Sequence, residues 1–350
     1  MLLKMMCSHF RSNRKAFPWS PMPGKNPYYD PSKSHHTPDG FTNVEPQNRQ
    51  EGDFKRWRKE RKAQRLPAPP EKGYEHFISQ WWQTADFSGT DDRLWFLGHA
   101  CLLLRVAGRY VLMDPALSDR ASPLSFYGPK RKTPVAAPVE KLPPIDVVLF
   151  SHNHYDHLDR ATVRKLLRRF PDVQFMVPLG MKPWLERRGA RYIEELDWWQ
   201  EHQFGDLTFS AVPARHWSMR TFWDRNQSLW CGWVVRNTDL RFYFSGDSGY
   251  SNQFELIGQR LGPFDLAAIP IGAYAPRWFM SAQHMDPQQA VTVFSQLRCQ
   301  KAVPIHWGVF ELADDSLDQP LNELAEAISQ SDSPEMEFKP LKIGASISKD

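Results

Sequence analysis

Cysteine is scarce in this sequence, and long hydrophobic runs are missing. The four cysteines among 350 residues are far apart, and no two form a Cys-x-x-Cys pair: Cys7, Cys101, Cys231 and Cys299. Such spacing argues against a disulfide framework and against a zinc site made of thiolates. No stretch reaches the roughly 18 consecutive apolar residues of a membrane-spanning helix, so we expect any membrane contact to be peripheral. Lys4 interrupts the short apolar opening, so we expect no export signal.

A strong excess of charge of one sign is also missing. The formal net charge is only +4, which is too small to indicate a nucleic-acid partner, and we expect none. Hydrophobic residues make up 41% of the chain, enough for a substantial core in a protein of this length. The composition therefore predicts a globular protein.

Composition divides the chain into two parts. Residues 1–90 are expected to form a Pro-rich, basic and partly irregular N-terminal extension, because closely spaced prolines between residues 18 and 31 exclude regular helix there. Within it, residues 53–66 predict a short basic helix that ends before Pro67. We expect this helix to face solvent, with contact to anionic lipid as the alternative. Residues 91–345 are expected to form a single domain.

Short apolar segments recur through this second part. The predicted strands are 94–97, 101–106, 109–113, 145–150, 207–212, 240–244, 266–269 and 302–305, and a helix is predicted over 161–170. Strands and helices in two successive runs predict an α/β fold, arranged as a four-layer αββα sandwich. Polar residues stand at several strand ends, which is where α/β folds place ligands.

One polar loop carries four metal-binding side chains within six residues. It follows the predicted strand 145–150 and contains His152, His154, Asp156 and His157. Alternate residues of an extended loop project to one side, so His152 and His154 can converge on one ion while the other two reach a second ion. A single loop histidine is more often a surface or capping residue. Four together indicate a metal site, with zinc favoured and iron or manganese as substitutes.

Three further strand ends supply the remaining ligands. They are His216, Asp247 and His306. Asp247 is the candidate for a bridge between two ions, because a carboxylate offers two acceptor oxygens and imidazole does not. Two ions about 3.5–4 Å apart lower the pKa of a bound water and clamp an anionic oxygen, which is hydrolytic chemistry. Asp114 and Asp159 are candidates to orient the histidines, on their nearness in sequence alone.

Several longer segments carry a family resemblance. They include SHNHYDHLD at 151–159, ELDWW at 195–199, GDSGY at 246–250 and GPFDLAAIPIGAYAPRWFM at 262–280. With them, the chain resembles the N-acyl-phosphatidylethanolamine-hydrolysing phospholipase D family of the metallo-β-lactamase superfamily. The resemblance runs from about residue 41 to about residue 324.

The resemblance implies a site with two Zn²⁺ ions per chain. His152, His154 and His216 would hold one ion, Asp156, His157 and His306 the other, and Asp247 would bridge them. The implied catalytic residues are Asp156, Asp247 and His284, and the implied substrate-binding residues are Tyr155, Gln283 and His284.

The implied reaction hydrolyses N-acyl-phosphatidylethanolamine, or a related phospholipid, to an N-acylethanolamine and phosphatidic acid. Together with the missing export signal, such a substrate predicts a cytoplasmic protein that associates peripherally with membrane. The contact would be made by the aromatic and basic segments 217–223 and 277–280 or by the basic helix. Homodimers are known in the family, so a dimer is implied by resemblance only.

The resemblance departs at Met219 and Trp223, where the animal enzymes carry residues tied to bile-acid contact, so bile-acid regulation is not carried over. Two other functions stay open. One is a hydrolase of a small soluble phosphodiester or lactone, because one fold serves many substrates. The other is an inert, metal-bound scaffold at a membrane surface, against which the full ligand set argues. Hydrolysis of β-lactams is not expected.

Overall fold

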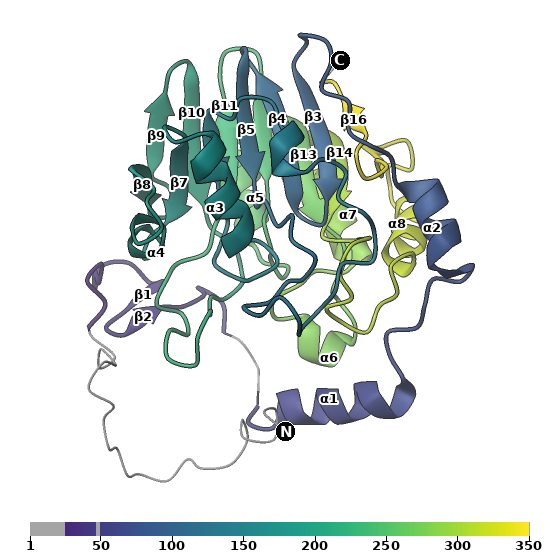
Figure 1. Cartoon of the computed structure of the whole chain (residues 1–350). Coiled ribbons are helices and arrows are strands. Elements are labelled where there is room, and N and C mark those ends of the chain that lie inside the picture. The colour runs from purple at the N-terminus through teal and green to yellow at the C-terminus, as the bar shows by residue number, and fades with distance from the viewer. Residues whose placement is uncertain (1–24, 47–49, 350) are drawn as a thin grey trace.

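Two seven-stranded sheets form the centre of the molecule. The computed structural model describes residues 25–46 and 50–349 (Figure 1). The first sheet has the strand order β16 (Ser346–Ile347), β3 (Arg93–Gly98), β4 (Cys101–Val106), β5 (Arg109–Met113), β6 (Val147–Leu149), β7 (Gln174–Pro178), β8 (Tyr192–Leu196). The second has the order β15 (Glu337–Phe338), β14 (Cys299–Ile305), β13 (Phe264–Pro270), β12 (Arg241–Phe244), β11 (Gly232–Arg236), β10 (Leu207–Val212), β9 (Glu201–Phe204).

Some of the helices cover the outer faces of the two sheets. The helices are α1 (Asp53–Gln64), α2 (Gly73–Trp81), α3 (Arg160–Arg169), α4 (Lys182–Glu186), α5 (Gln253–Leu261), α6 (Arg277–Met280), α7 (Pro287–Gln296) and α8 (Gln319–Ser329). The apolar side of α3 packs on the first sheet, and α7 packs on β13 and β14 of the second, with α5 and α8 against α7 (Figure 1). Helices α1 and α6 instead lie at one end of the molecule (Figure 1). The predicted four-layer αββα sandwich is confirmed.

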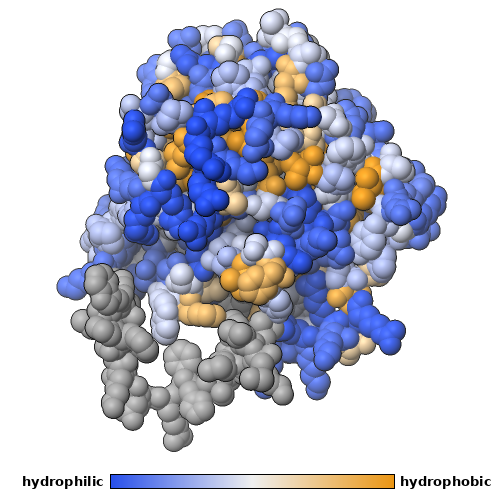
Figure 2. Space-filling view, in the orientation of Figure 1, coloured by the Kyte–Doolittle hydropathy of each residue, from blue (hydrophilic) through white to orange (hydrophobic). Residues whose placement is uncertain are grey.

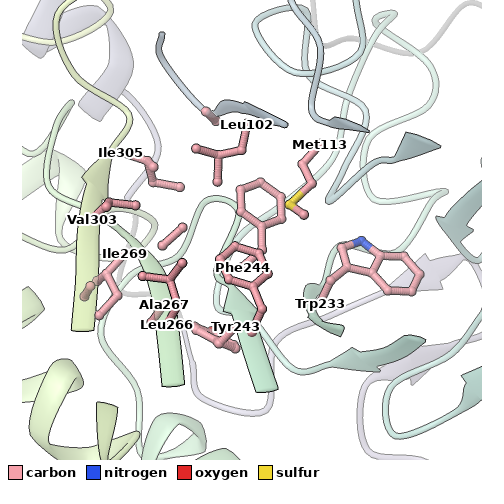
Figure 3. Close-up of a cluster of buried hydrophobic side chains, with 14 of the residues drawn as sticks. Leu102, Met113, Trp233, Tyr243, Phe244, Leu266, Ala267, Ile269, Val303 and Ile305 are labelled. Atoms are coloured by element: carbon pink, nitrogen blue, oxygen red, sulfur yellow. The ribbon is translucent and has the colours of Figure 1, made fainter. Parts of the chain in front are cut away.

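The main core lies between the two sheets. Leu102 and Met113 of the first sheet meet Trp233, Phe244 and Ile269 of the second (Figure 3). Strand β4 alternates between this core and the layer under α3, because successive side chains of a strand point to opposite faces. A strand buried on both faces reads as a nearly continuous apolar run, which is why the segment CLLLRV was recognisable in the sequence.

The eight predicted strands all correspond to observed strands, and the predicted helix over 161–170 corresponds to α3. The sequence did not predict β7, β8, β9 or β11, nor any of the helices α4 to α8. Strand β9 has the sequence EHQF and buries no residue fully, so it lacks the apolar pattern by which a strand is recognised. Edge strands of this polar kind resist pairing with other chains.

Parallel pairing places the strand ends that precede the predicted ligands close together. Strands β12, β13 and β14 are parallel neighbours, so the residues that follow them lie at one edge of the second sheet. Strands β5 and β6 are also parallel, which brings Asp114 and Ser151 together at the corresponding edge of the first sheet. The predicted ligand positions therefore share one end of the sandwich.

The predicted basic helix appears as α1, and one side of it is docked. Trp57 is buried, stacks on Phe279 of α6 at 5.0 Å between ring centroids, and donates to Asp314 Oδ1 at 3.1 Å. Arg61 donates to the carbonyl oxygens of Glu311 and Leu312. The surface around α1 is otherwise largely hydrophilic (Figure 2), so the expected solvated face is present beside an interface that the sequence did not predict.

The N-terminal extension is only partly described. Its residues 1–24 and 47–49 lie outside the described residues, as does Cys7, and the boundary at residue 90 remains a prediction. Within the described ranges, no helix is both long enough and apolar enough to span a bilayer.

Two leucines test the importance of the inter-sheet core. Leu102 is 0% exposed and Leu124 is 44% exposed. We expect Leu102→Ala to lower the free energy of unfolding by about 2–5 kcal/mol, because it removes buried methyl groups and leaves a cavity. Leu124→Ala should change it by less than about 0.5 kcal/mol. Urea denaturation of both variants measures the difference, and equal losses would contradict this account of the core.

Candidate metal centre

Three imidazoles converge in the first half of the site. His152 Nε2 lies 2.8 Å from His154 Nδ1, and His216 Nε2 lies 3.2 Å from the same nitrogen. His152 and His154 come from the loop after β6, and His216 follows β10 by four residues. The structure therefore brings together the three residues predicted to share one ion.

Two imidazoles and a carboxylate form the second half. Asp156 Oδ2 lies 3.3 Å from His157 Nε2 and 3.5 Å from His306 Nε2. His306 comes directly after β14, in a left-handed conformation with φ of 65°. These are the three residues predicted to share the other ion.

Asp247 lies between the two halves. Its Oδ2 atom is 3.9 Å from His152 Nε2 and 3.7 Å from His216 Nε2 on one side. On the other side it is 3.2 Å from His157 Nε2 and 3.1 Å from His306 Nε2. One carboxylate oxygen thus faces both groups, which is the position predicted for a bridging ligand.

Burial and charge set the protonation of these groups. Burial lowers the pKa of His152 and of His154 well below the ordinary value, and neighbouring histidines add to the effect, so both are neutral. Burial opposes a charge on Asp247, yet His157 and His306 hold the pKa of that carboxyl well below its usual range. Burial also opposes a charge on His157 and His306, but Asp247 and Asp156 raise the pKa of His306 to about 9 and that of His157 well above its usual range. Metal ions bind neutral imidazoles and ionised carboxylates, so His157 and His306 would each release a proton when a metal ion binds.

The donor set fits a pair of divalent ions. Three buried atoms that face the centre of the cluster have no hydrogen-bond partner in the described part of the chain: His157 Nε2, His306 Nε2 and Asp247 Oδ1. A buried polar atom left unsatisfied costs about 1–3 kcal/mol, and bound metal ions would satisfy these atoms. Imidazole nitrogen with carboxylate oxygen suits zinc, and iron or manganese less specifically.

Of the two aspartates predicted to orient the ligands, one does so. Asp114 Oδ2 accepts a hydrogen bond from His157 Nδ1 at 2.6 Å, and its other oxygen accepts from the Ser151 N–H at 2.7 Å. The prediction for Asp159 was wrong. Its carboxylate caps α3 by accepting from Ala161 N, and it also accepts from Ser118 N at 3.0 Å.

His99 is a member of the cluster that the sequence did not single out. Its Nε2 lies 3.0 Å from Asp156 Oδ2, and its carbonyl oxygen accepts from the His306 N–H at 2.8 Å. Burial, together with nearby His306, lowers its pKa to about 3, so His99 is neutral. One histidine in the β3–β4 turn therefore contacts two predicted ligands, and the only sequence signal was an isolated Gly-His pair.

The predicted substrate-binding residues border the cluster in different ways. His284 Nδ1 lies 4.0 Å from Asp247 Oδ2, and that nitrogen is buried without a hydrogen-bond partner among the described residues. The Gln283 carbonyl oxygen lies 2.9 Å from His216 Nδ1, while its side-chain amide faces the sulfur of Met280. The Tyr155 hydroxyl donates to the Arg220 carbonyl oxygen. Their binding of substrate remains a prediction.

Two glycines are required by the close approach of backbone around the site. A Cβ on Gly272 would lie 2.0 Å from the His306 carbonyl oxygen. Gly246 precedes Asp247 with φ of 58°, and a Cβ there would lie 2.4 Å from Ser151 Cβ. Both positions therefore exclude any side chain.

Asp114 and Asp159 form a matched pair for testing the site. We expect Asp114→Asn to weaken zinc affinity about 10- to 100-fold, because the His157 ring loses its anionic partner. Asp159→Asn should leave zinc affinity unchanged, since the hydrogen bonds of Asp159 go to Ser118, Ala161 and Thr162 and not to a predicted ligand. Competition with a chromophoric chelator measures both affinities. An unchanged affinity in the Asp114 variant would contradict the role given to that contact.

Comparison with known proteins identifies the family. A family model described as a β-lactamase superfamily domain matches residues 109–307. The chain is 42% identical over 227 residues to N-acyl-phosphatidylethanolamine-hydrolyzing phospholipase D 1 of Caenorhabditis elegans, covering 62% of this chain and 64% of that protein. It is 33% identical over 236 residues to the mitochondrial protein of the same description from Saccharomyces cerevisiae, covering 65% and 50%. The matches thus span less than two thirds of either relative.

Solved structures show the same fold at low identity. One is an isothiocyanate hydrolase from Delia radicum gut bacteria, with a TM-score of 0.58 at 20% identity over 73% of this chain and 98% of that one. Another is a possible metal-dependent hydrolase from Veillonella parvula, with a TM-score of 0.60 at 15% identity over 74% and 100%. With the family model and the two phospholipase D relatives, these findings confirm the predicted resemblance: the chain belongs to the metallo-β-lactamase superfamily of metal-dependent hydrolases.

Proposed function

We propose that this protein is a zinc-dependent phosphodiesterase of phospholipase D type, which hydrolyses N-acyl-phosphatidylethanolamine or a related phospholipid. The observation that carries the proposal is the pair of adjoining ligand groups that share Asp247. The products would be an N-acylethanolamine and phosphatidic acid. The two relatives that carry this activity in their names support the substrate class.

We assign one Zn²⁺ to His152, His154 and His216 and a second to Asp156, His157 and His306, with Asp247 as the bridge. When bound, such a pair of ions activates water for attack on phosphorus and neutralises the phosphate. Asp247 holds the two halves together, and Asp114 and His99 fix the directions of His157 and Asp156.

His284 is placed to act on the substrate. Burial lowers its pKa well below the ordinary value, so the ring is neutral and carries one N–H. The ring lies beside both halves, with its centroid 5.2 Å from those of His216 and His306. From there it can donate a hydrogen bond to a non-bridging phosphate oxygen and stabilise the charge that grows there in the transition state.

Arginines line a cavity at the start of α3, the helix that follows the metal-binding loop. The cavity has a volume of about 690 Å³, and its lining includes Arg120, Arg160 and Arg164 but none of the predicted ligands. Guanidinium groups bind phosphate strongly, because their fixed donors match its oxygens.

Exposed aromatic residues near the site support peripheral binding to a membrane, and the proposed cytoplasmic face rests on the sequence prediction alone. Trp223 is 79% exposed and Phe222 is 67% exposed, in the segment that follows His216. Trp278 of α6 lies under the Arg56 guanidinium of α1 at 4.2 Å from the ring centroid. Aromatic side chains beside basic ones are typical of proteins that lie on anionic membranes.

The activity is tested by incubating the zinc-loaded protein with N-acyl-phosphatidylethanolamine in mixed micelles. Mass spectrometry should detect an N-acylethanolamine and phosphatidic acid. We expect Asp247→Asn to lower the rate by about 100-fold or more, since the bridge loses charge, while His202→Ala, on the distant edge strand β9, should keep it. No product from a protein that holds two zinc ions would refute the substrate and direct attention to small soluble phosphodiesters and lactones.

Membrane binding is tested by sedimentation with vesicles. The wild type should sediment with vesicles of phosphatidylcholine and phosphatidylserine, and less in high salt, because salt screens surface charge. Replacing both Phe222 and Trp223 with serine should lower the bound fraction, whereas Tyr192→Ser, an exposed aromatic on β8, should not. Equal binding by all three proteins would contradict a role for the segment after His216.

A further inference from the structure

A segment outside the matched family region reaches the metal centre. Residues 26–46, here called the N-terminal strap, lie before the match at 109–307 and include the short hairpin of β1 (His36–Thr37) and β2 (Gly40–Phe41). Figure 1 shows this hairpin at the same end of the molecule as α6. The strap falls in the part that the sequence predicted to be a partly irregular extension.

The first part of the strap is anchored by a buried carboxylate. Asp197 Oδ1 lies 2.7 Å from His35 Nε2, and its Oδ2 lies 3.0 Å from His36 Nε2. Lys33 Nζ donates to the same Oδ2 at 2.7 Å. These two histidines and the aspartate also have the composition of a metal site, but the Lys33 ammonium already supplies the cation there. The cluster therefore serves as an anchor.

The hairpin then brings the strap against the segment that follows His216. The Phe41 N–H donates to the Asn226 carbonyl oxygen at 2.8 Å. At Gly40, a Cβ would lie 2.2 Å from that oxygen, so only glycine permits this approach. The chain beyond Phe41 is thereby directed toward His216.

Asn43 makes the contact on which the inference rests. Its side-chain Nδ2 donates to the His216 carbonyl oxygen at 2.8 Å, and its Oδ1 accepts from the His216 N–H at 3.0 Å. The same Oδ1 accepts from Trp230 Nε1 at 3.1 Å, which fixes the orientation of the amide. One carboxamide, 173 residues away in sequence, thus satisfies both backbone polar atoms of a predicted ligand.

This contact acts where the sheet gives no support. Strand β10 ends at Val212, and its paired residues end there too, so the ladder of β10 with β11 does not fix the backbone at His216. The Gln283 carbonyl oxygen holds the ring at Nδ1. Asn43 holds the backbone from which the ring projects, and together they direct His216 Nε2 toward His154 and Asp247.

We propose that Asn43 is a positioning residue for His216, so that the N-terminal strap completes the half of the metal centre formed by His152, His154 and His216. The inference rests on the proposed metal centre, and its test does not depend on the lipid substrate.

The test uses the full-length chain with the variants Asn43→Ala, Asn43→Asp, Val44→Ala and His216→Ala. Competition with a chelator measures affinity for each of two zinc ions. We expect Asn43→Ala to lower the affinity for one zinc ion about tenfold and to leave the affinity for the other unchanged. A tenfold loss is the low end of the effect of removing a residue that orients metal ligands. His216→Ala should weaken the same ion further. Val44→Ala, beside Asn43 and 48% exposed, should match the wild type.

Asn43→Asp separates positioning from simple packing. Aspartate has nearly the same shape, but it cannot donate to the His216 carbonyl oxygen and would set one oxygen against another. We expect it to bind zinc no better than Asn43→Ala. A wild-type affinity in the aspartate variant would overturn the proposal, because shape alone would then suffice.

Hydrogen exchange of the metal-free protein supplies a second readout. The His216 amide should exchange at least tenfold faster in Asn43→Ala than in Val44→Ala, with unchanged exchange in the core strands.

Equal exchange and two unchanged zinc affinities would overturn the inference while leaving the lipid activity standing. Selective loss of one ion from a protein that hydrolyses no phospholipid would support the inference and refute the proposed substrate. Failure of the wild type to bind zinc would overturn both.

Discussion

The Asp247 carboxylate lies within 4.0 Å of nitrogen atoms from five imidazoles, and the rest of the site is arranged around it. A buried carboxylate is costly unless charge or hydrogen bonds compensate for its loss of water. The compensating groups come from loops far apart in sequence, so they meet only when both sheets have formed. The parallel order of β12, β13 and β14, and of β5 and β6, places those loops at a common end. The chemistry of the site and the topology of the fold thus depend on each other.

The sequence predicted which side chains would converge, but only part of what supports them. His152 and Asp247 stand next to strands that are buried on both sides, and such strands are legible as apolar runs. Both Asp114 and Asp159 were predicted to orient a histidine because they lie near the loop in sequence. The structure supports this prediction for Asp114 and contradicts it for Asp159. Nothing in a sequence distinguishes a carboxylate that caps a helix from one that orients an imidazole, when both lie within a few residues of the same loop.

Other supporting contacts could not have been predicted at all. The carbonyl oxygen of Gln283 holds His216, and a carbonyl oxygen is present at every position of the chain. His99 contacts Asp156, which is 57 residues away in sequence, and Asn43 contacts His216, which is 173 residues away. Such partners can be identified only in the folded structure. Strand β9 was missed for a different reason, since an edge strand has no buried face to create an apolar pattern. Long-range polar contacts and polar edges leave no local signal.

The two glycines beside the ligands bear on how new specificities can arise on this scaffold. Side chains at 246 and 272 would collide with Ser151 or with the His306 backbone, so these positions are closed to variation whatever the substrate. Phe222 and Trp223 have exposed side chains and are under no such steric limit. Libraries aimed at a different substrate would therefore be best confined to these two positions and to exposed residues close to them. A substitution at these positions can change which substrate is bound without moving the predicted metal ligands.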